Sequence, residues 1–308
     1  MDHPLRRIVI GVGPSQDVDP HLRAAARLAA AHGATLYVVH AYRLPDPLLY
    51  PYPEMSAFSP ETLAVAHDAV RDRMQAQIAE VGNGAQIEVR AVAGPADAAI
   101  VEVAEEVGAD LIIVGATERG AVSRTLLGTT AGRVLRGASA PVLVHRAGDE
   151  RPLRRVLFTT DLSELSGRVF QRALAVVMAL GAGDAAEKRT LLVVGDGLDG
   201  PIALAPSEQA VTEGIAERQL GPFLEEASKG GTVMEGKVVL GDPAREILRE
   251  AEAWKADLVV VGTHGRGGVS RFLIGSVAET VVRHARCDVL VIPASSLPAT
   301  AEISPTSA

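Results

Sequence analysis

A glycine-rich segment between residues 262 and 277 has the composition of a phosphate-binding loop. It begins Gly262-Thr263-His264-Gly265-Arg266-Gly267-Gly268 and ends, after an apolar stretch, in Gly275-Ser276-Val277. Residues without a Cβ let the backbone adopt positive φ angles and let several N–H groups converge on an anion. A helix that begins at Ser276 would add its own N–H groups and its dipole. The chemistry expected here is the binding of a phosphate group by backbone amides.

Each of these residues also has a simpler explanation, which the sequence leaves open. The glycines can form a tight turn. Ser276, with Glu279 three residues later, matches a helix-capping box. His264 and Arg266 can be solvent-exposed side chains of a surface loop.

The elements that must position this loop occur twice in the 308-residue chain. The hexapeptide Leu-Arg-Arg-Ile-Val-Ile at residues 5–10 returns as Leu-Arg-Arg-Val-Leu-Phe at 153–158, and residues 108–115 return in similar form at 254–262. A repeat of this length exceeds the roughly 20–50 residues of solenoid repeats. We therefore expect one domain duplicated in tandem, with a first domain over 1–147 and a second over 153–294. Residues 295–308 are expected to form a disordered tail.

Each copy alternates short apolar runs with segments of helical periodicity. Runs that are apolar throughout indicate strands covered on both faces, as in a parallel sheet, and strand–helix alternation indicates right-handed βαβ units. The predicted fold class is α/β, with two doubly wound domains, each a five-stranded parallel sheet between helices. The glycine loop follows the fourth strand of the second copy, where open α/β sheets bind ligands. The predicted strands are 8–12, 35–40, 87–92, 110–114 and 141–145 in the first copy, and 156–160, 190–194, 237–240, 257–261 and 288–292 in the second.

The composition argues against several classes of function. A formal net charge of −8 disfavours non-specific nucleic-acid binding, which needs basic patches. The first residues lack the features of a secretory signal, and no apolar run reaches the ~20 residues of a membrane span. We therefore expect a cytoplasmic protein with neither membrane nor nucleic-acid partners. Cys287 is the one cysteine, so no intramolecular disulfide can form; a small apolar residue beside the last strand is expected, with a redox thiol as the alternative.

Three segments of the second copy resemble the universal stress protein family. The family's motif Gly-x2-Gly-x9-Gly-Ser/Thr is matched by Gly262, Gly265, Gly275 and Ser276. The segment Thr160-Asp161-Leu162-Ser163-Glu164 is similar to the turn after the family's first strand, and Gly241-Asp242-Pro243 to the Gly-x-Pro after its third strand. The resemblance extends over both copies and leaves out only the linker and the tail.

This resemblance implies a strand order of 3-2-1-4-5 in each domain, antiparallel pairing of the two fifth strands, and ATP, with or without Mg²⁺, as the ligand. Asp161, together with the backbone of Thr160, would hold the adenosine end. The residues implied around the phosphates are Gly262, Thr263, Gly265, Gly275, Ser276 and Val277. An alternative role for Asp161 is to cap the helix that follows it.

The first copy departs from the motif at two positions. Gly13 stands where the second copy has Asp161, and Glu118 stands where it has Gly265. A carboxylate ~5 Å from a phosphate charge costs roughly 3 kcal/mol at an effective dielectric constant of ~20, and the loss of a charged hydrogen-bond partner costs about 1.5–3 kcal/mol. Together these terms weaken binding at least about a hundredfold. We expect one ATP per chain, held by the second domain.

The expected function is that of an ATP-binding sensor or regulator in a stress response, acting as a homodimer with a regulatory protein partner. Two alternatives stay open: a slow ATPase that uses the same loop, and an interaction scaffold that binds no nucleotide. Because the sequence offers no positioned nucleophile, no Walker-type aspartate and no cluster of metal ligands, it assigns no catalytic and no metal-binding residue.

Overall fold

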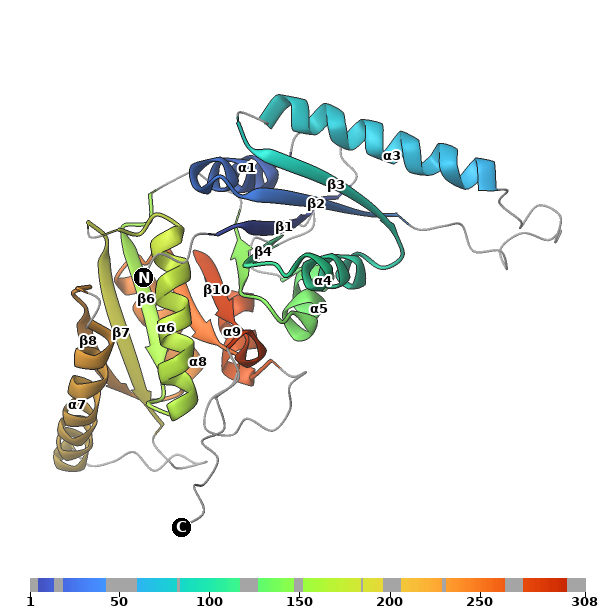
Figure 1. The fold of residues 1–308 in the computed structure, drawn as a ribbon. Coiled ribbons are helices and arrows are strands. Elements are labelled where there is room, and N and C mark those ends of the chain that lie inside the picture. Colours follow the sequence, from blue (N-terminus) through green and yellow to red (C-terminus); the bar gives the residue numbers. More distant parts are fainter. Residues whose placement is uncertain are drawn as a thin grey trace, which may run out of the picture.

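The computed structural model describes residues 5–13, 19–42, 60–81, 84–116, 127–146, 152–183, 185–195, 206–228, 231–263 and 274–297 (Figure 1). They form two α/β halves that share one ten-stranded sheet. The elements of the first half are β1 (Arg7–Gly11), α1 (Pro20–His32), β2 (Thr35–Tyr42), α3 (Pro60–Val81), β3 (Gln86–Ala93), α4 (Ala96–Val107), β4 (Leu111–Gly115), α5 (Thr129–Gly137) and β5 (Val142–His145). Those of the second half are β6 (Arg155–Thr160), α6 (Glu164–Ala179), β7 (Glu187–Val194), α7 (Pro206–Ser228), β8 (Glu235–Leu240), α8 (Pro243–Ala253), β9 (Leu258–Gly262), α9 (Ser276–His284) and β10 (Asp288–Ile292), followed by a short 3-10 helix, Ala294–Ser296.

The sheet repeats one strand order in its two halves. The order across the sheet is β3-β2-β1-β4-β5-β10-β9-β6-β7-β8. The strands within each half pair in parallel, for example with Ile8 opposite Leu36 and Val156 opposite Lys188. Each half therefore has the order 3-2-1-4-5. The predicted α/β fold with two doubly wound halves is confirmed.

β5 and β10 join the halves as an antiparallel pair, with Val144 opposite Val289 and Leu143 opposite Leu290. The pairing implied for the two fifth strands is thus confirmed. We call this pairing of β5 with β10 the seam. Because the seam is antiparallel, the parallel strands of the two halves point in opposite directions. Their carboxyl ends, where open α/β sheets bind ligands, lie at opposite ends of the shared sheet.

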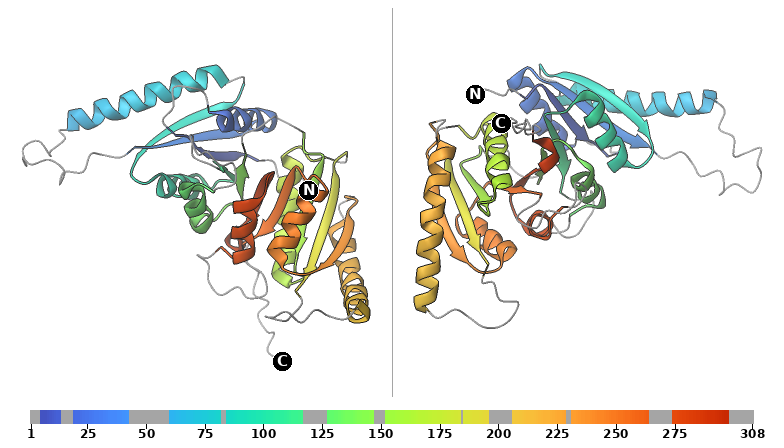
Figure 2. Two further views of the ribbon diagram at one scale, coloured as in Figure 1. Left: turned by 180° about the vertical axis from the view of Figure 1, so that it is seen from behind. Right: turned by 60° about the horizontal axis from the view of Figure 1, so that its bottom comes forward.

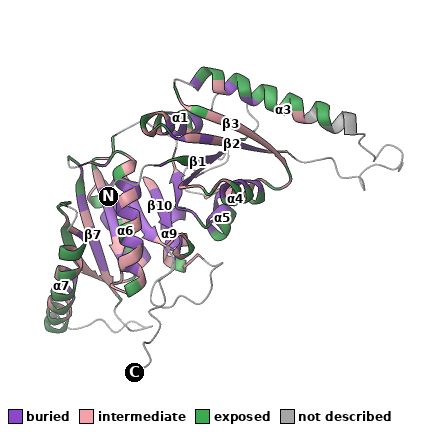
Figure 3. Ribbon diagram, in the orientation of Figure 1, coloured by how far each residue is buried: buried purple, intermediate pink, exposed green. Residues whose placement is uncertain are grey.

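Helices cover both faces of the sheet, and the core on each face runs through both halves (Figures 2 and 3). On one face α1 and α6 bury Leu22 and Phe170 in a common cluster. On the other face α4 and α5 of the first half and α8 and α9 of the second pack in the same way, with Val134 and Val281 fully buried. The apolar strands are therefore covered on both sides, which is why they read as unbroken apolar runs.

β7 begins three residues before the predicted strand, at Glu187 rather than Thr190. Its first residues are charged, and each charge has a partner that lets the strand continue. Lys188 Nζ donates to the carbonyl oxygens of Gly183 and Ala186 at 2.8 and 3.1 Å. Arg189 pairs with carboxylates on β8 and α8. A sequence pattern that counts only apolar residues misses such a start.

The outer helices complete the molecule. Figure 3 shows α3 with most of its surface exposed, and α7 flanks the opposite edge of the sheet. At the carboxyl end of the described chain, Leu297 packs against the core that contains Leu22; the rest of the expected tail, residues 298–308, lies outside the described residues. Within the described ranges, none of the helices has the length and apolar character that crossing a membrane requires.

Candidate functional site

The turn after β6 is held by hydroxyl groups. Thr160 is buried, and its Oγ1 lies 3.0 Å from Ser166 Oγ and accepts the Leu162 N–H at 3.1 Å. Leu162 has a φ of 59°, a left-handed conformation that is rare for a side chain of this size. Such strain persists only where the surroundings enforce it, and it is concentrated at ligand-binding sites. The hydroxyl contacts of Thr160 supply that enforcement here.

Asp161 lies beside the start of α6 and is not its cap. Its Oδ1 accepts the N–H of Ser163 at 3.0 Å and the hydroxyl of Ser163 at 2.7 Å. Ser163 is the capping residue, since its Oγ accepts the N–H of Ser166 at 3.1 Å. The helix-cap alternative for Asp161 is therefore wrong. Asp161 orients the residue that caps the helix, and its carboxylate stands at the carboxyl end of β6.

The two ends of the glycine loop are tied together at its base. Thr263 is buried; its N–H donates to Ile292 O at 3.1 Å and its Oγ1 accepts the N–H of Ala294 at 3.2 Å. Gly275 N donates to Thr263 O at 2.7 Å. A Cβ on Gly275 would stand 2.9 Å from the same backbone oxygen. Glycine is required at 275 because the loop closes there by direct contact between backbones.

α9 begins at Ser276, and the residue in the capping position is Gly275. Gly275 has no side chain with which to cap the helix, and the exposed Ser276 is the first helical residue. The predicted capping box is wrong: the carboxylate of Glu279 instead accepts from Arg283 at 2.9 Å. The first N–H groups of α9, which a cap would otherwise bind, are suited to an anion.

These parts meet at one edge of the sheet. β6 and β9 are parallel neighbours, with Phe158 opposite Val260, so Asp161 follows β6 at the edge where Gly262 ends β9. Of the predicted site residues, the structure brings together Thr160, Asp161, Gly262, Thr263, Gly275, Ser276 and Val277 at this edge. Gly265, with His264 and Arg266, lies outside the described residues. Across the described ranges there is no group of three His, Cys, Asp or Glu residues that could hold a metal ion.

The first half closes its loop in the same way and contains a cavity that the sequence did not predict. Gly128 N donates to Ala116 O at 2.8 Å, and Gly128 occupies the capping position of α5. The cavity, of about 430 Å³, is lined by Gly11, Val12, Gly13, Asp19, His21, Val39, Ala41, Ala96, Ile100, Val114, Gly115, Gly128, Thr130 and Ala131. A signal for it exists in the sequence: Gly-Val-Gly ends the first strand where the second copy has Thr-Thr-Asp.

Two histidines from distant parts of the chain meet at this cavity. His21 Nδ1 lies 2.8 Å from His145 Nδ1, and the rings meet edge to face at 5.1 Å between centroids. His145 Nε2 lies 3.8 Å from Asp288 Oδ2, which belongs to β10 of the second half. Burial raises the pKa of Asp288, although His145 and the backbone N–H of Arg146 act to lower it. Sequence reasoning missed these residues because they lie on three elements that are distant in sequence and meet only in the folded structure.

Arg146 fastens the same corner of the seam. Its Nε donates to Cys287 O at 3.0 Å, and its guanidinium donates to Val282 O at 2.6 Å in the last turn of α9. Burial raises the pKa of the Cys287 thiol to about 12. A thiol with so high a pKa stays protonated and is a poor nucleophile, which favours a packing role for Cys287 over a redox role.

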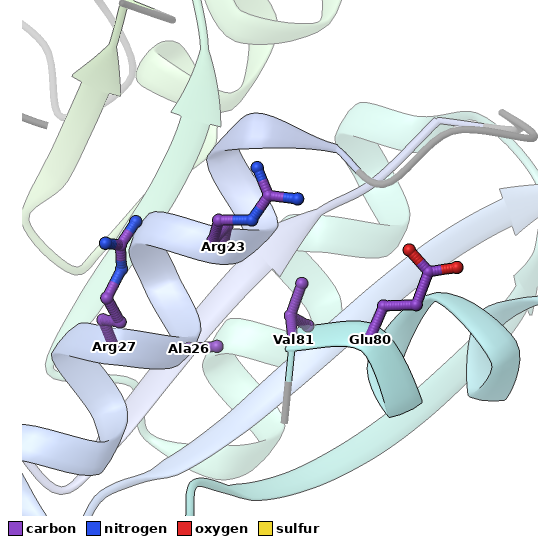
Figure 4. Close-up of a pocket in the computed structure, with 5 residues that line it drawn as sticks. All are labelled: Arg23, Ala26, Arg27, Glu80 and Val81. Atoms are coloured by element: carbon purple, nitrogen blue, oxygen red, sulfur yellow. The ribbon is translucent and has the colours of Figure 1, made fainter. Parts of the chain in front are cut away.

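A smaller hollow of about 150 Å³ lies between α1 and the end of α3 (Figure 4). Its charged side chains are Arg23 and Arg27 on α1 and Glu80 on α3, and Ala26 and Val81 complete the lining. None of these residues lies at a strand end or in a glycine-rich turn. This hollow therefore lacks the features of the phosphate site expected from the sequence.

Comparison with known proteins identifies the family. The model described as "Universal stress protein family" matches residues 4–146 and again residues 152–293. The universal stress protein Rv2005c of Mycobacterium tuberculosis is 28% identical over 299 residues, which cover 92% of this chain and 96% of that protein. A universal stress protein of Mycobacterium bovis, Mb2028c, matches to the same extent.

Two solved structures share the arrangement of both halves. PA1789, a protein of unknown function from Pseudomonas aeruginosa, has a TM-score of 0.67 at 19% identity, over 94% of this chain and 92% of its own. A universal stress protein from Archaeoglobus fulgidus has a TM-score of 0.60 at 20% identity, over 92% of this chain and 95% of its own. These likenesses bear on the fold alone. Together with the two family matches, they show that this chain belongs to the universal stress protein family and carries two of its domains in tandem.

Proposed function

We propose that the second half binds one adenine nucleotide, ATP, and that the chain acts as a nucleotide-dependent regulator in a stress response. The observation that carries this proposal is the meeting of three features at one edge. These are the strained turn at Asp161, the closed base of the glycine loop at Thr263 and Gly275, and the start of α9 at Ser276. Each is a recognised device for holding part of a nucleotide.

The parts of the site divide by chemistry. The Asp161 carboxylate accepts hydrogen bonds, so it suits the hydroxyl and amino donors of adenosine, beside the backbone of Thr160. The phosphate oxygens suit the N–H groups at the start of α9 and along the glycine loop, from Gly262 through Gly265 to Val277. Mg²⁺ would be held through the phosphates and water, as it is in many nucleotide sites.

The first half is proposed not to bind ATP with comparable affinity. Gly13 removes the carboxylate that Asp161 supplies, and Glu118 adds a negative charge to the loop. From the energies of about 3 and about 1.5–3 kcal/mol given above, the second half is favoured at least about a hundredfold. One nucleotide per chain is the expected stoichiometry.

Titration calorimetry with ATP on the full chain tests the proposal. The informative variant is Asp161→Asn, because the amide oxygen can still accept from Ser163 while the charge is lost. Asp242→Asn is the matched control, since Asp242 caps α8 in the same half and accepts the Arg245 N–H at 2.8 Å. We expect D161N to bind ATP at least about tenfold more weakly and D242N to bind normally. Two equivalent sites per chain, or full affinity in D161N, would contradict the proposal.

The rival functions are separated by two further measurements. Native mass spectrometry of the protein mixed with ATP distinguishes a nucleotide binder from a scaffold that binds none. Phosphate release followed over hours distinguishes a binder from a slow ATPase. Homodimer formation, a regulatory protein partner and a cytoplasmic location belong to the same proposal. Sedimentation with and without ATP tests homodimer formation. A dimer that forms only with nucleotide would show that assembly depends on ligand binding.

A further inference from the structure

Arg146, the residue that follows β5 in the first half, reaches the end of α9 in the second half. Its guanidinium donates from Nε to Cys287 O at 3.0 Å and from Nη2 to Val282 O at 2.6 Å. Its backbone N–H donates to Asp288 Oδ1 at 2.7 Å, so the main chain at Arg146 is anchored to the second half as well. One planar guanidinium thus binds both the last turn of α9 and the chain that leads from α9 into β10.

These contacts satisfy groups at the end of the helix. The last carbonyl groups of a helix have no partner within it, and an arginine side chain can bind them and interact favourably with the negative end of the helix dipole. Val282 lies in the last turn of α9, which ends at His284. Burial lowers the pKa of Arg146 from its ordinary value, and a partly buried charge needs partners such as these carbonyl groups and the Asp288 carboxylate. The end of α9 is therefore held by a residue of the other half.

The repeat does not reproduce this arrangement in the first half. The position that corresponds to Arg146 is occupied by Pro293. A proline side chain has no hydrogen-bond donor, so Pro293 cannot bind carbonyl groups of α5, the helix that corresponds to α9, in the same way. The fold itself therefore does not require Arg146. The arginine serves the helix whose first N–H groups, at Ser276 and Val277, belong to the proposed nucleotide site.

The direction of α9 decides how these N–H groups meet phosphate oxygens. The hydrogen bond from Gly275 N to Thr263 O fixes the point at which the helix begins, and a contact at the other end fixes the direction of its axis. Val282 lies about 9 Å along the helix from Ser276, so a displacement of about 2 Å at Val282 turns the axis by about 12°. Binding groups must be held to within about 10–20° of the productive geometry. Loss of the Arg146 contact is therefore expected to weaken binding moderately rather than to abolish it.

We propose that Arg146 is a positioning residue for the nucleotide site of the second half, and that the first half contributes to ATP binding through it. By binding Val282 O and Cys287 O, Arg146 sets the direction of α9 and of the N–H groups at Ser276 and Val277. This inference rests on the proposed function. It gives the first half, whose own motif is degenerate, a part in the binding of ATP by the second half.

The test compares variants of the full chain by titration calorimetry with ATP and by nuclear magnetic resonance of backbone amides without ATP. Arg146→Met removes the charge and every side-chain donor but keeps an unbranched stem, whereas Arg146→Lys keeps the charge and loses the planar pair of donors. We expect R146M to bind ATP about three- to tenfold more weakly, and R146K to recover part of that loss. In the ligand-free chain, the amide signals of Ser276 and Val277 should shift in R146M, although they lie at the opposite end of α9 from the substituted contact.

Two controls separate positioning from the loss of a charge and from the loss of stability. Arg286→Met removes an arginine just beyond α9 whose side chain is 80% exposed and pairs with Glu252 of α8 at 2.6 Å. Its ATP affinity and its amide signals at Ser276 and Val277 should match those of the parent chain. Val134→Ala removes buried methyl groups from α5, which lowers the melting temperature, and ATP affinity measured well below that temperature should stay unchanged.

The outcomes distinguish this inference from the proposed function. Parental ATP affinity in R146M, or unmoved amide signals at Ser276 and Val277, would overturn the inference. An equal loss of affinity in V134A would also overturn it, because the effect would then follow stability rather than the direction of α9. A parent chain that binds no ATP would contradict the proposed function instead, and the amide signals of the ligand-free variants would still decide whether Arg146 positions the start of α9.

Discussion

Replacing Gly275 with alanine separates the structural role of the glycine loop from its role in binding. The added Cβ would stand 2.9 Å from Thr263 O, the oxygen to which Gly275 N already donates. A backbone oxygen cannot rotate away as a flexible side chain can, so the start of α9 must move. Contacts of this kind cost about 1–3 kcal/mol. At about 2 kcal/mol, the melting temperature of a cooperative unit of 150–250 residues falls by roughly 4–8 °C.

The same displacement moves the N–H groups proposed to bind phosphate. Hydrogen bonds weaken steeply as their geometry departs from the optimum, so we expect ATP affinity to fall at least about tenfold, equivalent to about 1.4 kcal/mol. Calorimetry at 15–20 °C, well below the melting temperature of the variant, measures affinity apart from unfolding. The control is Gly195→Ala: Gly195 follows β7 at the same edge, and a Cβ there meets no atom within 4 Å.

Three outcomes would refute this reasoning. An unchanged melting temperature in G275A would mean that the close approach between Gly275 and Thr263 imposes no constraint. A lowered melting temperature with unchanged ATP affinity would mean that the glycine serves loop closure alone and that α9 does not face the phosphates. Loss of affinity in both G275A and G195A would show a general sensitivity of the edge rather than a phosphate site.

Two further predictions concern stability. Burial alone would raise the pKa of Glu250, but hydrogen bonds from Lys237 and Arg189 lower it below its ordinary value. The ionised Glu250 carboxylate therefore stabilises the fold above the unfolded pKa of about 4.3, and this stabilisation is lost as the pH falls through the lower folded pKa. Glu250→Gln should cost about 1–3 kcal/mol at pH 7 and flatten the acid limb of a melting-temperature profile; an acid limb identical to that of the parent would contradict this. Leu290→Asp places a charge in the fully buried seam, which costs several kcal/mol, and scanning calorimetry should show lowered or separated transitions. The control is Val211→Asp: Val211 lies on α7 and is 62% exposed, so this variant should leave the transitions unchanged.

The fold could be predicted from the sequence because its strongest signals are local. β9 is apolar throughout, and β1 is apolar after its first residue, Arg7; an unbroken apolar run of this kind is typical of a strand buried on both faces. The strand order and the antiparallel seam followed from the family resemblance, since no local pattern states which strands become neighbours. The prediction of strand ends was less accurate where charged residues have partners that the apolar pattern does not reveal, as at Lys188 and Arg189.

The candidate site was predicted as a set of residues rather than as a set of roles. The sequence placed a cap at Ser276 and offered Asp161 as a cap, but the structure gives these positions to Gly275 and Ser163. A helix start shifts by one residue according to how the preceding turn closes, and that closure depends on contacts such as Gly275 with Thr263. The pair of His21 and a residue 124 positions away leaves no local pattern at all.

β10 connects the base of the glycine loop to the boundary between the two halves. At its carboxyl end, Ile292 O accepts the N–H of Thr263, at the base of the glycine loop. At its amino end, Asp288 accepts the Arg146 N–H at 2.7 Å and faces His145 of the first half. The strand between these ends spans four residue steps, about 13 Å, and it is hydrogen-bonded on both sides, to β9 and to β5. β10 is therefore restrained on both sides along its length, and the base of the glycine loop and Asp288 belong to one hydrogen-bonded element. Duplication alone would have produced two halves that pack only within themselves, whereas the antiparallel pairing of β5 with β10 sets Asp288 of the second half beside His145 of the first.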